Sequence, residues 1–222
     1  MSNPVSNPAL PPDPMVYHGQ FGDYTITDQD RRGVKIYRTG LAIAALALAL
    51  GVTLGLGFPH RPALVQAISL CYTALWLGLG LSLATVHIYL VPLHRTLQGL
   101  WLMGGLASLI LSHGIDGPLA ATVITYPQTL WGIGLTFAAL TGLYIKEAFC
   151  FNRLETKLLT PLVPGLLLGH LFGPLPLGVE KVLLILWALL FVVFALRKFT
   201  QPLVPDIGDK SVFAYLKAQN QG

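Results

Sequence analysis

The sequence predicts an all-α, polytopic transmembrane helix bundle with about six spans and both termini on the cytoplasm-type side of the bilayer. Composition supports this class, because 54% of the 222 residues are hydrophobic, only 11% are charged, and the mean hydropathy is +0.64. A soluble domain normally carries about 25% charged residues, since its surface faces water. Six long apolar runs lie between short polar segments, and a bilayer is the solvent that suits such runs.

Residues 1–33 are interpreted as a polar N-terminal tail that is partly disordered. Its first fourteen residues are rich in proline and offer little for a core to bury. Residues 16–27 alternate in part and break at glycines, which favours a short hairpin or an extended segment at the membrane interface. Asp28 or Asp30 is a candidate cap for a helix that starts near Arg31.

Residues 34–199 form the predicted transmembrane domain. A spanning helix needs about 20 residues to cross about 30 Å of hydrocarbon. The fifth segment contains Pro161 and Pro164 in its first turns, so a re-entrant segment is the alternative to a full crossing. The six predicted segments are Gly40–Phe58, Leu64–Val91, Leu97–Ser112, Thr129–Tyr144, Leu158–Phe172 and Val182–Leu196.

Basic residues favour six crossings over five. With six spans and an inside N-terminus, twelve of the fourteen Lys and Arg residues lie inside, and only Arg61 and Lys181 lie outside. If the fifth segment does not cross, the split weakens to nine and five. The positive-inside rule therefore selects the six-span topology.

Three further segments have specific interpretations. Gly51 and Gly55 form a small-xxx-small pattern, which either allows close helix packing or arises by chance in a small-residue helix. The apolar stretch Ile115–Pro127 is interpreted as a loop, with a segment lying flat on the outer face as the alternative. Residues 200–222 form a cytoplasmic tail with a short amphipathic helix, for which Asp209 or Ser211 is the candidate cap.

Chemical motifs of enzymes are missing from the sequence. It contains no phosphate-binding loop, metal-binding helix motif, nucleophile elbow or dinucleotide fingerprint, so we predict a non-enzymatic protein. Asp, Glu, Lys and Arg are expected to lie outside the spans, which disfavours ion-coupled transporters and proton pumps. Nucleic acid is not an expected partner, because the basic residues gather at helix ends and not on one face.

Three histidines are weak candidates for binding a cofactor. His87, His113 and His170 are expected within or at the ends of the apolar segments, where a neutral imidazole can ligate haem iron or chlorophyll magnesium. Only His113 and His170 are expected at one depth, as a two-histidine site requires. The alternative is that each ring hydrogen-bonds a neighbouring carbonyl. We predict no cofactor and no metal, with haem or chlorophyll as the alternative.

The segment from Lys146 to Lys157 is interpreted as an inner loop that docks a partner. It combines both signs of charge with aromatic side chains, and loops on rigid helices often carry recognition. A solvated loop anchored at the interface by its aromatics is the alternative. The candidate partner-binding residues are Lys146, Glu147, Phe149, Phe151, Asn152, Arg153 and Glu155.

Three blocks together carry a resemblance to a known family: Tyr37–Gly40, Lys146–Leu162 and Pro205–Tyr215. With His87–Leu90 and Gly169–Gly173 between them, the chain resembles an uncharacterised integral membrane protein family, a domain of unknown function, from cyanobacteria and plant plastids. The resemblance covers nearly everything from Val16 onward. It implies a thylakoid or plasma membrane in a photosynthetic host, but no activity or ligand. In such a host the cytoplasm-type side that the basic residues select for the termini is the cytoplasmic or stromal side.

These expectations leave three hypotheses for function. The first is an accessory or assembly protein that contacts a photosynthetic membrane complex. The second is a transporter or channel for a small, weakly polar solute, suggested by the prolines within and beside the apolar segments. The third is a haem- or pigment-binding membrane protein that uses His87, His113 or His170.

Overall fold

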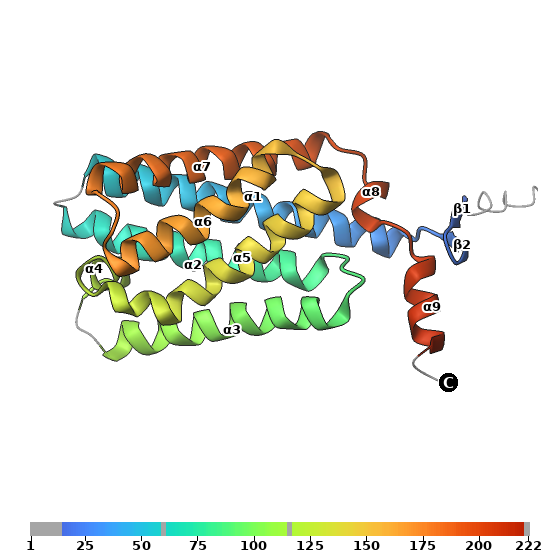
Figure 1. The fold of residues 1–222 in the computed structure, drawn as a ribbon, viewed down its shortest axis with the longest axis horizontal. Coiled ribbons are helices and arrows are strands. Elements are labelled where there is room, and N and C mark those ends of the chain that lie inside the picture. Colours follow the sequence, from blue (N-terminus) through green and yellow to red (C-terminus); the bar gives the residue numbers. More distant parts are fainter. Residues whose placement is uncertain (1–14, 59–60, 115–116, 220–222) are drawn as a thin grey trace, which may run out of the picture.

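The computed structural model describes residues 15–58, 61–114 and 117–219, and the predicted tail residues 1–14 lie outside this part. Six long helices run side by side in one bundle, and the all-α fold is confirmed (Figure 1). Each predicted segment corresponds to one of them. Their bounds are α1 (Asp28–Gly57), α2 (Pro62–Thr85), α3 (Val91–Gly114), α5 (Leu130–Phe151), α6 (Leu154–Phe172) and α7 (Leu177–Thr200).

Fewer than six of the described helices are both long enough and apolar enough to cross a membrane. Within the described residues, α1, α2, α7 and the segment Pro127–Phe151 meet that standard, and α3 with the short α4 (Leu119–Thr125) would make a fifth span bent by 93°. Helix α6 does not meet it, because Glu155, Lys157 and two prolines lower its hydropathy. Its 19 residues nevertheless extend about 28 Å, close to the thickness of the hydrocarbon core.

Helix α6 is continuous, although Pro161 and Pro164 lie inside it. It packs against α5 and α7 along the bundle, so the re-entrant alternative does not describe its shape. The turn before it is very short. Asn152 ends α5 in the left-handed conformation (φ 51°), which asparagine tolerates better than most residues. The expected inner loop is therefore two helices joined by Asn152 and Arg153.

Helix α2 ends at Thr85 and not near Val91 as predicted. Side chains from α3 satisfy its end, because the His94 ring and the Gln98 amide bond to the carbonyl of Leu83 at 2.6 and 3.3 Å. Such side-chain partners replace the hydrogen bonds that the last helical carbonyls lack. Residues 86–90 then form the connection to α3.

Helices α1 and α2 approach each other closely in the core. A Cβ on Gly40 would lie 2.5 Å from the carbonyl oxygen of Gly78, so neither helix leaves room for a side chain there. The predicted pair Gly51 and Gly55 meets the α2 side chains of Cys71 and Ile68 only at ordinary contact distance. Small residues therefore fix this helix crossing, at a different position from the one predicted.

Short elements gather at both ends of the bundle. Strands β1 (Val16–Gly19) and β2 (Gly22–Thr25) form an antiparallel hairpin, with Val16 opposite Thr25. Thr27 caps α1 in a capping box with Asp30, so the helix starts three residues before Arg31 and includes the end of the predicted tail. The predicted stretch 115–127 contains α4 and the first residue of the 3-10 turn Pro127–Thr129 (η1) instead of a plain loop, except for residues 115–116, which lie outside the described part.

Two short helices complete the C-terminal tail, where a single one was predicted. They are α8 (Val204–Ile207) and α9 (Ser211–Gln219). Asp209 precedes α9, and its carboxylate accepts a hydrogen bond from the Ser211 amide at 2.9 Å. The hairpin, α8 and α9 all lie at the same end of the bundle (Figure 1).

Candidate functional site

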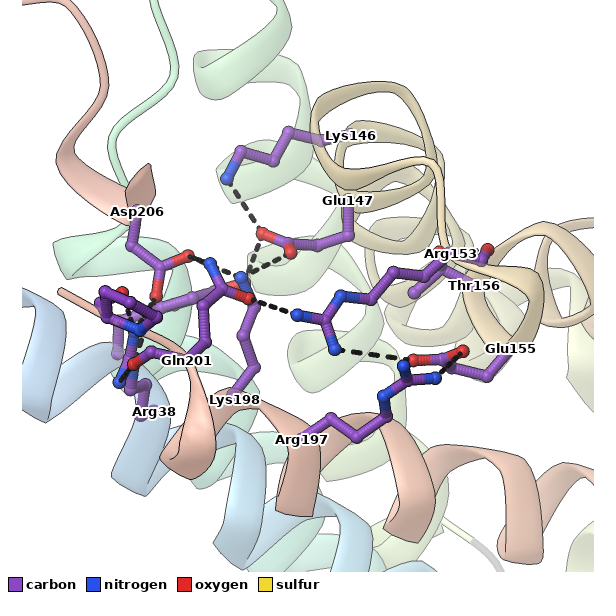
Figure 2. A network of polar contacts seen from close by, with 12 residues as sticks. Arg38, Lys146, Glu147, Arg153, Glu155, Thr156, Arg197, Lys198, Gln201 and Asp206 are labelled. Atoms are coloured by element: carbon purple, nitrogen blue, oxygen red, sulfur yellow. Dashed lines mark hydrogen bonds and ion pairs between the residues drawn. The ribbon is translucent and has the colours of Figure 1, made fainter. Parts of the chain in front are cut away.

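Five buried charges meet where α1, α5, α7 and α8 come together, at the end of the bundle that carries the hairpin (Figures 1 and 2). Four of these side chains belong to residues that are at most 4% exposed, and the fifth, that of Lys146, is 10% exposed. We call this set the charge cluster. Its members are Arg38, Lys146, Glu147, Lys198 and Asp206.

Arg38 of α1 joins the C-terminal tail to the bundle. Its Nε and Nη2 atoms both donate to Oδ2 of Asp206, at 2.9 and 2.6 Å. Its remaining donors reach the carbonyls of Gln201 and Pro202 at 2.7 and 2.8 Å. These carbonyls follow the end of α7, where the backbone lacks helical partners, so one guanidinium satisfies both the carboxylate and the helix end.

The ammonium group of Lys198 bridges two carboxylates from different elements. It lies 2.6 Å from Oε2 of Glu147 and donates to Oδ1 of Asp206 (Figure 2). The ring of Phe151 covers it at 3.9 Å from the centroid, and the ring of Tyr37 lies 5.6 Å away. Carboxylates and aromatic faces both stabilise a cation that has left water.

Glu147 of α5 is the carboxylate of the charge cluster that contacts α1, α5 and α7. Its Oε1 atom accepts hydrogen bonds from the Tyr37 hydroxyl and from the Lys146 ammonium, both at 2.8 Å. With Lys198 on Oε2, both carboxylate oxygens are occupied by donors from three helices. A buried carboxylate is tolerated in this way only when its lone pairs are satisfied.

A second set of charges lies beside the cluster, between the start of α6 and the end of α7. Arg197 donates to Oε2 of Glu155 at 2.9 Å, and Arg153 lies 3.9 Å from Oε1 of the same carboxylate. Arg153 also donates to the side chain of Gln201, which in turn bonds to Asp206. Figure 2 shows both sets in one continuous network, and we call Arg153, Glu155 and Arg197 the peripheral ion group.

The charge cluster is suited to fixing how helices meet. It contains three cations and two carboxylates, and each carboxylate oxygen has at least one donor. Removing one member would leave an uncompensated charge, whereas the complete set holds four elements in one arrangement.

Beyond the cluster, the two terminal segments hold each other. We call residues 15–27 and 203–219 the terminal platform. The Asp209 carboxylate accepts the Gln20 amide at 2.7 Å, and the Ser211 hydroxyl accepts the Phe21 amide at 3.0 Å. The Phe21 ring stacks on Tyr215 at 4.0 Å. These contacts join segments about 190 residues apart in the chain into one unit at the end of the bundle.

Lys210 and Tyr89 fasten the platform to the bundle. Lys210 donates to Asp30 at 2.7 Å, and the Tyr89 ring lies 4.8 Å from Phe213. Gly208 has a φ of 73° and sits against the Tyr89 hydroxyl, so a side chain there would meet both strain and a clash. Burial raises the pKa of Tyr89 to about 12. Its hydroxyl therefore stays protonated across the physiological pH range.

The three candidate histidines each contact a different partner. His87 lies 3.9 Å from Asp30, His113 bonds to the carbonyl of Leu109 in its own helix, and His170 lies 3.1 Å from both carboxylate oxygens of Glu180. Within the described residues there is no group of three or more His, Cys, Asp or Glu side chains that could hold a metal. His113 therefore has the neighbouring carbonyl partner that the alternative interpretation expected. His170 has a carboxylate partner instead.

The predicted partner-binding residues divide into two groups. Phe149 is 85% exposed and Asn152 is exposed, so both are available to a partner or to lipid. The others turn towards the network, in the charge cluster, in the peripheral ion group or over Lys198. These inward side chains are Lys146, Glu147, Phe151, Arg153 and Glu155.

Sequence reasoning missed the buried pairing of Arg38, Lys198 and Asp206, because it placed these charges beyond the spans and assigned them no partners. In the structure all three residues are buried, and Arg38 and Lys198 lie within α1 and α7. A signal was present. Arg38, Glu147 and Asp206 each belong to one of the three blocks that carry the family resemblance, and the structure brings these blocks together.

Comparison with known proteins gives one match. The model of a family described as uncharacterized integral membrane protein (DUF2301) matches residues 81–215, which is more than half of the chain. This range runs from the end of α2 into α9 and includes the charge cluster except for Arg38. No curated protein and no solved structure matches.

Proposed function

Because the chain belongs to the DUF2301 family of multi-pass integral membrane proteins, we propose that it is a non-enzymatic accessory or assembly protein of a photosynthetic membrane. It acts through contacts with a membrane complex. The photosynthetic setting, a thylakoid or plasma membrane of a cyanobacterium-like host, comes from the resemblance described above. The observation that carries the proposal is the terminal platform, a preformed unit outside the bundle with apolar side chains on its surface.

The surface of the platform is suited to protein contacts. Exposed apolar side chains occur on both of its segments, with exposed fractions between 37% and 71%. Outside the membrane, apolar side chains gathered into one patch mark contact sites for proteins or membranes. The exposed set is Met15, Val16, Phe21, Tyr215 and Leu216.

The platform is also held rigidly, which favours recognition. Asp209, Ser211 and Lys210 bond to the hairpin and to α1, so little order has to be imposed when a partner binds. A preorganised surface loses less conformational entropy on association than a flexible tail does. The charge cluster below it supports the same role by locking α8 to the bundle.

The proposed topology has six crossings with both termini on the cytoplasmic or stromal side. Contact between the hairpin and α9 supports termini on one side, and the length and continuity of α6 support its crossing. Cysteines introduced singly at His18, Lys217 and Lys181, in a chain without native cysteines, test this. A membrane-impermeant thiol reagent applied from the outside should label only position 181. Labelling at 18 or 217 under the same conditions would contradict the topology.

Photo-crosslinking in the native membrane tests the proposed function. A photoreactive amino acid at Val16 or Leu216 should capture a subunit of a photosynthetic complex, and Leu216→Asp should abolish capture at Val16. Leu106, which is 59% exposed on α3, is the matched control and should capture lipid or bundle neighbours only. Identical products at Val16, Leu216 and Leu106 would overturn the proposal.

A transporter or channel for a small solute is the second candidate, and the buried charge cluster favours it, because ionisable groups inside a helical bundle often mark a pathway. Liposomes containing the protein would then swell faster in glycerol or urea than empty ones, and Lys198→Met would remove the difference.

The proposed absence of a cofactor is tested by the absorption spectrum of the purified protein. A haem or chlorophyll absorption band would favour the third hypothesis.

A further inference from the structure

An apolar groove of about 430 Å³ runs between α6 and α7. Side chains of both helices line the groove. It stays open at Pro161 and Gly165, because neither residue carries a long side chain. A Cβ added at Gly165 would meet nothing within 4 Å. The residues that line the groove include Leu158, Pro161, Gly165, Leu183 and Leu186.

One end of this groove is basic. On α7, Arg197 lies about three helical turns beyond Leu186 and therefore on the same face. On α6, Lys157 precedes Pro161 by four residues, which again places it on the same face. Arg197 is 54% exposed at its side chain and Lys157 is exposed. Arg197 contacts Glu155, three residues before Leu158, so the two cations lie beyond the Leu158 end of the groove, one on each helix.

Charge at this end is positive after neighbouring groups are counted. Arg197 and Arg153 share the Glu155 carboxylate, and Lys157 adds a third cation, so three positive charges face one negative charge. Figure 2 shows Arg153 and Arg197 approaching Glu155 from two elements. Glu155 itself is 4% exposed, so it lies behind the arginines.

We propose that the groove binds one anionic membrane lipid. An acyl chain lies in the groove between Leu158 of α6 and Leu186 of α7, and the phosphate lies between Arg197 and Lys157. From Leu158 to Gly165 the groove descends about 10 Å, within the depth of one leaflet. A neutral isoprenoid or zwitterionic lipid would fill the apolar part equally well. The isoprenoid, however, brings no counter-charge to the basic end, and the zwitterionic headgroup brings a cation of its own together with its phosphate, so neither adds net negative charge there. Basic pockets between helices at the cytoplasmic surface are suited to anionic headgroups. This inference does not depend on the proposed function.

Native mass spectrometry of the full chain in detergent tests the proposal, with dioleoyl phosphatidylglycerol and dioleoyl phosphatidylcholine as probes. One phosphatidylglycerol should bind in preference to phosphatidylcholine. Lys157→Gln should reduce the preference about fivefold, and Lys157→Gln with Arg197→Gln should abolish it. Free glycerol phosphate should not compete, because it lacks an acyl chain.

Two further variants separate the groove from general effects on folding. Gly165→Leu should fill the groove and reduce binding of both lipids. Gly134→Leu is the matched control, because a Cβ at Gly134 also meets nothing within 4 Å, and Arg95→Gln is the control for loss of an exposed basic residue. Both controls should bind as the wild type does. Equal binding of the two lipids by the wild type, or unchanged preference in the Lys157/Arg197 variant, would overturn the proposal.

Discussion

Arg38 and Asp206 are 168 residues apart in the chain, yet two guanidinium nitrogens of Arg38 donate to one carboxylate oxygen of Asp206, at 2.9 and 2.6 Å. Both side chains are at most 5% exposed. The pair connects the first helix to the short helix after the last long one. It therefore closes the bundle between its two terminal segments.

Breaking this pair should strongly destabilise the protein. We expect Arg38→Met to lower the free energy of unfolding by about 3–5 kcal/mol, because Asp206 would keep a buried charge with fewer partners. Unfolding by SDS titration in detergent measures the change. Arg95→Met, which removes an exposed arginine, is the matched control and should alter stability by less than about 0.5 kcal/mol. A similar small change for Arg38→Met would contradict the structural role of the pair.

The crossing of α1 and α2 should depend on Gly40 and not on Gly51. Gly40→Ala places a methyl group 2.5 Å from the Gly78 carbonyl oxygen, and such overpacking costs about 1–3 kcal/mol. Gly51→Ala meets only Cys71 at 3.4 Å, so it should be neutral or stabilise the helix by up to about 1 kcal/mol. The same SDS titration compares the two variants. Equal effects would mean that the helices do not approach closely at Gly40.

Asp209 should control whether the hairpin stays on α9. In Asp209→Ala the Gln20 amide loses its acceptor at 2.7 Å, and we expect faster hydrogen exchange over residues 16–25, measured by mass spectrometry. Asp23→Ala is the matched control, because Asp23 pairs with His18 inside the hairpin. It should leave the exchange of Gln20 close to that of the wild type. Unchanged exchange in both variants would show that the remaining contacts, such as the Phe21–Ser211 hydrogen bond and the Phe21–Tyr215 stacking, hold the hairpin without Asp209.

Acid should release the same contact. Hydrogen bonds from the Ser211 side chain and the Gln20 amide lower the pKa of Asp209 below its ordinary value of 3.8. A lowered pKa in the folded state stabilises the contact above the ordinary pKa, and this stabilisation is lost as pH falls through the lowered value. Spin labels at Val16 and Gln219, in a chain without native cysteines, should therefore move apart only below about pH 4. Separation that is already complete at pH 6 would exclude Asp209 as the controlling group.

Protonation of His87 should weaken the fold at mildly acidic pH. Burial lowers the pKa of His87, and Lys146 and Lys210 add to this effect, while Asp30 and Asp206 oppose it. The unfolded chain then binds a proton at a higher pH than the folded one, so stability falls as pH drops below about 6.5. Comparing unfolding at pH 7.5 and 5.5 should show a smaller loss for His87→Gln than for the wild type. An identical loss in both would assign the pH dependence to other groups.

Much of the architecture followed from apolar length and helix-stop signals, which act locally. The six segments, the hairpin region and the C-terminal helix were predicted because hydrophobic runs, glycines and caps are read within a few residues. The end of α2 was misplaced, because His94 and Gln98 satisfy its last turn from another helix. The loop predicted at Lys146–Lys157 is helical except at Asn152 and Arg153, and Lys146 and Glu147 pair inside the bundle instead of facing water.

The sequence by itself therefore determined that this chain is an all-α integral membrane protein, because scarce charge and long apolar runs have one compatible solvent. Only the tertiary structure decided which charges pair. Arg38, Glu147 and Lys198 lie far apart in the chain, and their pairing with one another and with Asp206 depends on distances of about 3 Å that helix packing sets. It also decided that Arg197 of α7 reaches Glu155 of α6 and that an apolar groove opens between these two helices, since both depend on the register of one helix against the other.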